Sequence, residues 1–211
     1  MSERIVSNVA PVIKGLLDLL GEMDQSLKFV YDEEQTYDSS IKRLRANGRI
    51  SGDVREVFPL LSYSRSVLRT STHGVSRRLN TMPIIFPQGG GIAVKTAALH
   101  GEFDLPFRLY TKSAVALENF EISYLSEVGA SNEKEFTVTL PELGDFKYFV
   151  AFAPLEVKEH VSEGTFYKAA QGQMTVRGMF FLFKGESPVI TKVSASIREM
   201  LGQELADILL T

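Results

Sequence analysis

The sequence predicts an α+β fold, with a mostly antiparallel sheet flanked by helices. Strand-like alternation is concentrated in the second half of the chain, and amphipathic helical stretches interrupt it, which fits α+β better than a parallel α/β sheet. The 211 residues are enough for one sizeable core. We therefore expect residues 1–211 to form a single domain.

The first third of the chain predicts a helix, a strand and a second helix. Apolar residues recur every three or four positions from Ile13 to Leu27, which is the pattern of a helix with one buried face. Residues 27–31 then alternate like a strand. Asp38 is expected to cap a short helix over residues 39–45, which Gly48 ends.

The next segment is the least regular. Residues 57–68 predict a strand region that Pro59 interrupts. Residues 72–104 contain two prolines and the glycine run 89–91, and they predict a long, mobile, hairpin-like arm. Regular structure is expected to resume at Leu105.

A strand over residues 107–111 is predicted to lead into an amphipathic helix over residues 114–128, ended by Gly129. The buried side of that helix is expected to carry Leu117, Phe120, Tyr124 and Val128.

Three further strands are predicted after that helix, over residues 136–140, 146–157 and 173–183. Residues 159–172 are predicted to be a polar connection. The alternation of apolar side chains changes parity near Gly178, which predicts a β-bulge there.

The end of the chain predicts a helix over residues 196–210. Ser196 and Glu199 have the spacing of a capping box at its start. An apolar end would be unfavourable in water, so we expect this helix to dock on its own domain or on a neighbouring copy. Its apolar face carries Leu201, Leu205 and Ile208.

Composition excludes several classes of site. The chain has no cysteine, which rules out disulfides, thiol nucleophiles and cysteine-bound zinc, and suits a reducing cytosol. The hydrophobic fraction of 44% and the charged fraction of 23% are ordinary for a globular protein. No apolar run reaches the ~18 residues of a membrane span, and no signal-peptide pattern opens the sequence. We expect no association with a membrane.

Charge is unevenly distributed along the chain. Residues 57–101 have a net charge of +5 and no acidic residue, whereas residues 14–38 have −5 and residues 118–145 have −6. These segments either neutralise one another inside the subunit or form a head-to-tail contact between copies, and binding of nucleic acid by the basic segment is a third possibility. The basic segment includes Arg65, Arg69, Arg77 and Arg78, and the first acidic segment includes Asp32, Glu33 and Glu34.

No catalytic pattern is found in the sequence. The histidines at 73, 100 and 160 lack the spacing of metal ligands. The glycine run 89–91 lacks the lysine and the following helix of a phosphate-binding loop, and no serine has a nucleophile-elbow pattern. We predict no catalytic, cofactor or metal site.

Two stretches together resemble a known family. The segment Pro106-Phe-Arg-Leu-Tyr-Thr-Lys-Ser113, running directly into the helix 114–128, resembles the strand–helix unit of the contractile-tail terminator and sheath-stabiliser family of tailed bacteriophages. Residues 146–157, 159–172 and 173–183 resemble that family's paired long strands and their loop. The elements near the N-terminus follow the same order, while the helix after residue 196 has no counterpart in the family.

The resemblance implies a virion structural protein. Such a subunit forms a ring, usually a hexamer, that caps the tail in the neck and joins it to the head, without catalysis or cofactor. Its partners are tail tube, sheath and head–tail connector proteins, and DNA only passes through. The virion is assembled in the host cytoplasm. Candidate contacts between subunits are Arg65, Arg69, Arg77, Arg78, Asp32, Glu33, Glu34, Leu201, Leu205 and Ile208.

The sequence is also compatible with other functions. One is a different tail part, such as a baseplate or tube-associated subunit. Another is an α+β domain that binds a small ligand or catalyses a reaction at an unfamiliar site. A third is a nucleic-acid binder that uses the arginines of residues 57–101.

Overall fold

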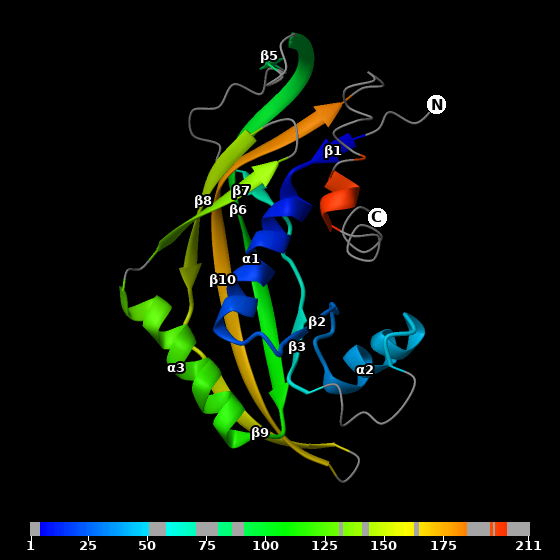
Figure 1. Ribbon diagram of the computed structural model, residues 1–211, viewed down its shortest axis with the longest axis vertical. Helices are drawn as coiled ribbons and strands as arrows, with labels where there is room; N and C mark the ends of the chain where they lie inside the picture. Colours follow the sequence, from blue (N-terminus) through cyan, green and yellow to red (C-terminus); the bar gives the residue numbers. More distant parts are fainter. Residues whose placement is uncertain are drawn as a thin grey trace.

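A computed structural model describes residues 5–50, 58–70, 80–85, 91–130, 133–140, 144–162, 165–184, 195 and 197–201. Its elements are, in order, β1 (Ile5–Ser7), α1 (Val9–Met23), β2 (Lys28–Tyr31), α2 (Tyr37–Ala46), β3 (Leu60–Tyr63), β4 (Arg69–Thr70), β5 (Asn80–Ile85), β6 (Gly91–Thr111), α3 (Ala114–Ala130), β7 (Lys134–Leu140), β8 (Gly144–Phe152), β9 (Glu156–Ser162) and β10 (Thr165–Lys184) (Figure 1).

The described strands form one sheet in the order β2-β3-β6-β10-β8-β7, with β4 and β5 paired to β6 and with β1 and β9 paired to β10. Every pairing is antiparallel except that of β2 with β3. The two longest strands, β6 and β10, run side by side along most of the molecule (Figure 1). The prediction of an α+β fold with a mostly antiparallel sheet is confirmed.

Helices α1 and α3 cover one face of this sheet and build the main core. Leu16 of α1 and Phe120 of α3 are fully buried, together with Phe107 of β6. A Cβ atom on Gly15 would lie 3.2 Å from side-chain atoms of both Phe136 and Val138, so the glycine lets α1 approach β7 closely.

The opposite face is covered at one corner by α2. Ile41 and Leu44 pack there on Val30, Leu60 and Tyr110 in a second, smaller cluster. The loop before α2 is fixed to the sheet by Gln35, which has a left-handed φ of +49°. Its side-chain amide donates to the carbonyl of Pro106 at 2.5 Å, and its own carbonyl accepts from the Tyr110 hydroxyl at 2.5 Å.

The first helix and strand are confirmed, but the cap of the second helix is corrected. Thr36, not Asp38, caps α2, because its hydroxyl accepts a hydrogen bond from the backbone N–H of Ser39 at 3.2 Å. Gly48, just after this helix, has a φ of +70°, as expected for the residue that ends a helix.

The predicted boundaries around the arm are wrong. Strand β3 covers only Leu60–Tyr63 of the expected strand region 57–68. Regular structure resumes well before Leu105, because β5 covers Asn80–Ile85 and pairs with the first part of the continuous strand β6, which begins at Gly91. Residues 72–79 and 86–90 of the proposed arm lie outside the described residues.

Two predictions for the long strands are also corrected. The expected strand 146–157 is divided into β8 and β9, with Pro154 between them, where a residue without an N–H cannot extend the ladder. The expected connection 159–172 is instead largely the β9–β10 hairpin, with Thr165 paired to Ser162. Backbone hydrogen bonds hold this hairpin together, so it forms without the alternation of apolar side chains that predicts a strand.

The bulge predicted at Gly178 is absent, because pairing with β6 continues in register through Gly178↔Gly101 and Met179↔His100. Gly178 lies on the covered face, and a Cβ atom there would meet the ring of Tyr148 at 2.3 Å. That ring takes the place of a side chain, while Met179 points to the other face and is 36% exposed.

The C-terminal helix is confirmed over residues 197–201, and Ala195 is already helical, one residue before the predicted start. Ile197 and Leu201 are buried in the main core. The described part of this helix therefore docks on its own domain, and residues 202–211 are not described.

Candidate functional site

The basic residues predicted to contact other subunits have different environments. Arg69 forms ion pairs within the chain, to Glu102 at 3.2 Å and to Asp104 at 3.0 Å. This pairing supports partial neutralisation of the basic segment inside the subunit. Arg65 is exposed, so its role as a contact stays a prediction. The remaining two, Arg77 and Arg78, lie outside the described residues.

Asp32 is buried and bonded inside the subunit. Its side chain is 0% exposed and accepts hydrogen bonds from the hydroxyls of Ser39 and Ser40, the latter at 2.8 Å. The Arg43 guanidinium lies 3.2 Å from the carboxylate. Such a carboxylate holds the start of α2 against β2 and has no surface to offer a neighbour, so we remove it from the candidate contacts.

The two acids that follow Asp32 have the opposite environment. Glu33 and Glu34 are exposed, and the Tyr31 hydroxyl donates to Glu33 at 3.3 Å. Burial, followed by the negative charge of Glu33, raises the pKa of Tyr31 above its ordinary value. These two glutamates remain candidate contacts.

The predicted apolar contacts are only partly described. Leu201 is 4% exposed in the main core and is therefore a packing residue. Leu205 and Ile208 lie beyond the last described residue.

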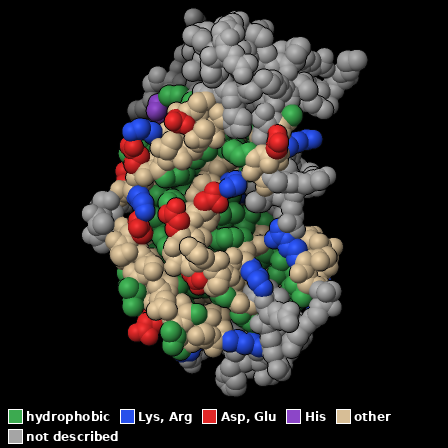
Figure 2. Space-filling model, in the orientation of Figure 1, with side chains coloured by type: hydrophobic (Ala, Val, Ile, Leu, Met, Phe, Trp, Pro, Cys, Tyr) green, Lys and Arg blue, Asp and Glu red, His purple; other side chains and the backbone are tan. Residues whose placement is uncertain are grey.

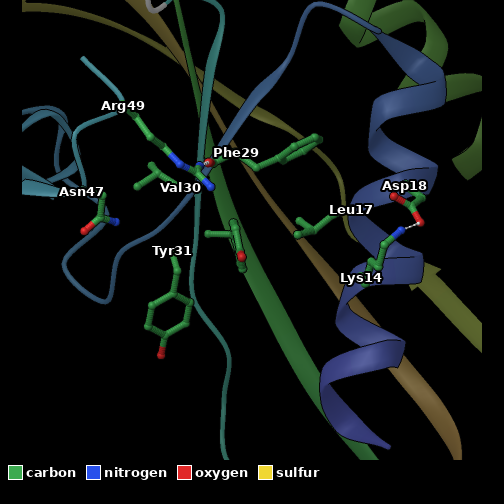
Figure 3. Close-up of a pocket in the computed structure, with 9 residues that line it drawn as sticks. Lys14, Leu17, Asp18, Phe29, Val30, Tyr31, Asn47 and Arg49 are labelled. Atoms are coloured by element: carbon green, nitrogen blue, oxygen red, sulfur yellow. Dashed lines mark hydrogen bonds and ion pairs between the residues drawn. The ribbon is translucent and has the colours of Figure 1, made fainter. Parts of the chain in front are cut away.

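A pocket opens between α1 and the β2–β3 edge of the sheet, with a volume of about 190 Å³. Its walls include the apolar side chains of Leu17, Phe29 and Tyr63. Lys14 and Arg49 stand at its border (Figure 3).

Local contacts fix both of these cations. The Lys14 ammonium lies 2.6 Å from the carboxylate of Asp18, one turn along α1. The Arg49 guanidinium donates to the backbone carbonyl of Phe29 at 3.0 Å, which holds the segment after α2 over the pocket (Figure 3). The result is a cavity with apolar walls and a polar rim, whose charged residues are the Lys14–Asp18 pair and Arg49.

The outer side of α3 is a second notable surface, because it is apolar and exposed. Val115 is 64% exposed, Ile122 is 60% exposed and Leu125 is 47% exposed. We call these three side chains the outer stripe. Figure 2 shows hydrophobic side chains at the surface over this helix, at the lower left. Exposed apolar patches on otherwise polar surfaces mark interaction sites.

Neither surface was predicted from the sequence, for different reasons. The outer stripe has a signal, since positions 115, 122 and 125 are spaced by seven and three and share a side of the helix. The stronger pattern of Leu117, Phe120 and Tyr124 predicted only a helix that packs on the core. The pocket has no sequence signal, because its residues come from four separate segments: α1, β2, the segment after α2, and β3.

The open part of the sheet face beyond α2 carries polar and charged side chains that bond to one another. Arg108 of β6 donates to the Gln171 side chain of β10 at 3.0 Å. The hydroxyl of Thr175 donates to Asp104 at 2.8 Å. Arg177 pairs with Glu133. Cross-strand pairs of this kind stabilise a solvated sheet face.

Titratable groups suited to catalysis do not converge in the part of the chain that is described. No group of three or more acidic or histidine side chains is placed to hold a metal ion there. His100 is exposed on β6. Burial raises the pKa of Tyr63, Tyr124 and Tyr148 above the ordinary value, so these phenols stay protonated within the core.

Among the described helices, none is both long and apolar enough to cross a membrane. In comparisons with protein families and with curated proteins, the chain matches neither a family nor a single protein. The candidate functional site therefore rests on the outer stripe and the pocket of this chain.

Proposed function

We propose that this protein is a structural subunit of a contractile phage tail: a tail terminator in the neck, whose copies form a ring, six by the resemblance, between tail and head. It acts by binding and not by catalysis. Its partners are copies of itself and the tube, sheath and head–tail connector proteins, while DNA passes through the ring.

The outer stripe of α3 is the observation that carries the proposal. The inner side of α3 is fully occupied by packing, with Phe120 and Tyr124 at 0% exposure, so the helix needs no further apolar residue for the fold. Ile122 and Leu125 nevertheless face solvent. Apolar side chains beyond the needs of the core are what a subunit with permanent neighbours requires.

The order of elements gives further support. Strand β6 leads directly into α3, and β8, β9 and β10 then form the long antiparallel part of the sheet. The strand–helix unit agrees with what the resemblance implies, whereas the implied pair of long strands with a loop is here divided into β8, β9 and β10. Residues 197–201 add a helix on the core that the resemblance does not contain.

Assembly is tested on the purified protein. Negative-stain electron microscopy is expected to show rings, and light scattering after size exclusion is expected to give a mass several times 23.5 kDa. A monomer that persists at high protein concentration and low salt would contradict the proposal.

The location in the tail needs a separate experiment. A tagged copy expressed in infected cells is expected to co-purify with head–tail connector and tube proteins. Co-purification with baseplate proteins alone would place the subunit at the other end of the tail. Genes for sheath, tube or connector proteins beside its own gene would agree with the neck assignment.

A further inference from the structure

We infer that Asn47 is a site of covalent modification, at which the side-chain amide becomes a carboxylate through a cyclic imide formed with the backbone nitrogen of Gly48. The inference goes beyond the proposed function and does not depend on it. Three observations carry it: an exposed asparagine followed by glycine, an amide group that no described residue holds, and open space around the glycine.

The reaction needs water and no other reagent. The Gly48 nitrogen loses its proton and attacks Cγ of Asn47, the new N–Cγ bond closes a ring, and the side-chain nitrogen leaves as ammonia. Water then opens the imide at one of its two carbonyl groups. Opening at Cγ gives aspartate with the normal backbone. Opening at the backbone carbonyl gives isoaspartate, in which the chain continues through the former side chain.

Asn47 is the only asparagine in the sequence that precedes a glycine. It follows the last residue of α2 and is exposed, as is Gly48. Its side-chain amide has no hydrogen-bond partner among the residues that the structure describes. Figure 3 shows this side chain at the edge of the pocket, on the same side as Arg49. An amide without a partner can turn toward the backbone nitrogen that follows it.

Gly48 leaves room for the ring to close. It has a φ of +70°, and a Cβ atom built on it would meet no atom within 4 Å. Because glycine has no side chain, its nitrogen is open to close approach by another group. Any other residue at this position would place a Cβ atom beside the attacking nitrogen.

The last turn of α2 must open before the ring can form. The Gly48 N–H donates to the Arg45 carbonyl at 3.1 Å, and the Arg49 N–H donates to the Leu44 carbonyl at 3.0 Å. Asn47 has a ψ of 5°, which directs the Gly48 nitrogen away from the side chain. Helix ends open locally at a small cost in free energy, so these two bonds can break while the rest of α2 stays folded.

Two other asparagines lack these features and serve as internal controls. Asn8 is buried, and its amide donates to the Tyr148 hydroxyl at 2.5 Å. Asn119 lies inside α3 and is followed by the buried ring of Phe120. Neither amide is placed to reach a free backbone nitrogen, so both are expected to persist.

The product changes the charge at the border of the pocket. Residues 37–49 carry four basic residues and one acidic residue, so their net charge falls from +3 to +2 when residue 47 becomes acidic. The Arg49 guanidinium donates to the Phe29 carbonyl at 3.0 Å. A carboxylate binds a guanidinium more strongly than a neutral carbonyl does. The conversion therefore places a competing acceptor for Arg49 at the end of α2.

Peptide mapping by mass spectrometry tests the site on the folded natural protein, incubated in isotopically labelled water at neutral and at mildly alkaline pH. Position 47 is expected to become a mixture of aspartate and isoaspartate that carries oxygen from the water. The conversion is expected to be faster at the higher pH, because the Gly48 nitrogen attacks without its proton. An amide at Asn47 that lasts as long as the one at Asn119 would overturn the inference.

Two variants test the route through the imide. Gly48→Ala is expected to slow the conversion at least about tenfold, because the added methyl group crowds the attacking nitrogen. Alanine is strained at a φ of +70°, so Asn47→Gln is the second variant. Its longer side chain would have to close a larger ring, and it is expected to give no product. Aspartate without isoaspartate in the natural protein, or an equal rate in Gly48→Ala, would show direct hydrolysis and overturn the imide.

A parallel incubation in urea separates the folded subunit from the unfolded chain. The folded protein is expected to react more slowly than the unfolded chain, because the two hydrogen bonds at the end of α2 must open first. It is still expected to accumulate product, since this opening does not require global unfolding. Absence of product in the folded protein, over a period in which the unfolded chain converts completely, would overturn the inference.

Discussion

Helices α1 and α3 lie on the same face of the sheet, yet their outer sides differ. The outer side of α1 is charged, with Lys14 paired to Asp18 and with Glu22 exposed. The outer side of α3 carries Ile122 and Leu125 instead. The inner sides are alike, since both helices bury large apolar side chains in one core.

This difference separates two uses of apolar residues. On α1 the apolar residues pack in the core of the same subunit, and Leu17 also lines the pocket. On α3 one set serves folding and a second set is left over for a partner. Variants on the inner side of α3 are therefore expected to lower the free energy of unfolding, and variants on its outer side to weaken association between copies. Variants on the outer side of α1 serve as controls.

The largest effect is expected inside α3. Phe120→Ala is expected to lower the free energy of unfolding by about 3–5 kcal/mol, because it removes a fully buried ring and leaves a cavity. Ile122→Ala, on the outer side, is expected to change it by less than about 0.5 kcal/mol. Urea unfolding at a fixed low protein concentration measures both. Similar losses in the two variants would contradict the division of α3 into two sides.

Alkaline pH is expected to weaken the core under both helices. The pKa of Tyr124, on the inner side of α3, and that of Tyr148, near the start of α1, are raised by burial. In the unfolded chain tyrosine ionises near pH 10. The contribution of each buried tyrosine to the free energy of unfolding is therefore fully present below about pH 10. As pH rises further it is lost, by about 1.4 kcal/mol per pH unit for each such tyrosine.

Single variants separate the contributions of Tyr124 and Tyr148 to this dependence of stability on pH. Tyr124→Phe and Tyr148→Phe are each expected to make the alkaline loss less steep. Tyr148→Phe is also expected to lower stability at neutral pH, because its hydroxyl donates to the Met179 carbonyl at 3.0 Å and accepts from Asn8 at 2.5 Å. An unchanged alkaline profile in both variants would show that these phenols ionise freely.

Two glycines are expected to respond in opposite directions. Gly178→Ala is expected to cost about 1–3 kcal/mol, because the new Cβ atom would overlap the buried Tyr148 ring. In α1, Gly21→Ala is expected to stabilise by up to about 1 kcal/mol, since its Cβ atom would meet only Phe29, at 3.9 Å, and alanine favours a helix. Thermal unfolding checks both, and a tolerated Gly178→Ala would mean that Tyr148 has room to move.

The smallest effect is expected on the outer side of α1. Asp18→Asn removes the exposed ion pair with Lys14 and is expected to lower the free energy of unfolding by about 0.3–0.5 kcal/mol. High salt is expected to abolish the difference between this variant and the natural protein. A loss of several kcal/mol would show that the outer side of α1 matters for the fold as much as the inner side.

Local patterns in the sequence determined the class of the fold and most of its elements. Helix α1, the helix after residue 113 and several strands follow from the spacing of apolar residues, which depends on backbone geometry alone. The same patterns failed where pairing partners decide the structure. The β9–β10 hairpin has no apolar alternation to reveal it, and Gly178 looked like a bulge because its place is filled by a ring 30 residues away.

The candidate site depended on the tertiary structure to a greater degree. Asp32 and Glu33 are neighbours with the same chemistry, yet one is buried among hydroxyls and the other is exposed, because the chain bends after β2 and only Asp32 meets the hydroxyls at the start of α2. The core side of α3 followed from the sequence, since Leu117, Phe120 and Tyr124 are buried as predicted, but only the structure shows that Ile122 and Leu125 stay exposed. The pocket exists only because α1, β2 and the segment after α2 meet in space, and no local pattern encodes such a meeting.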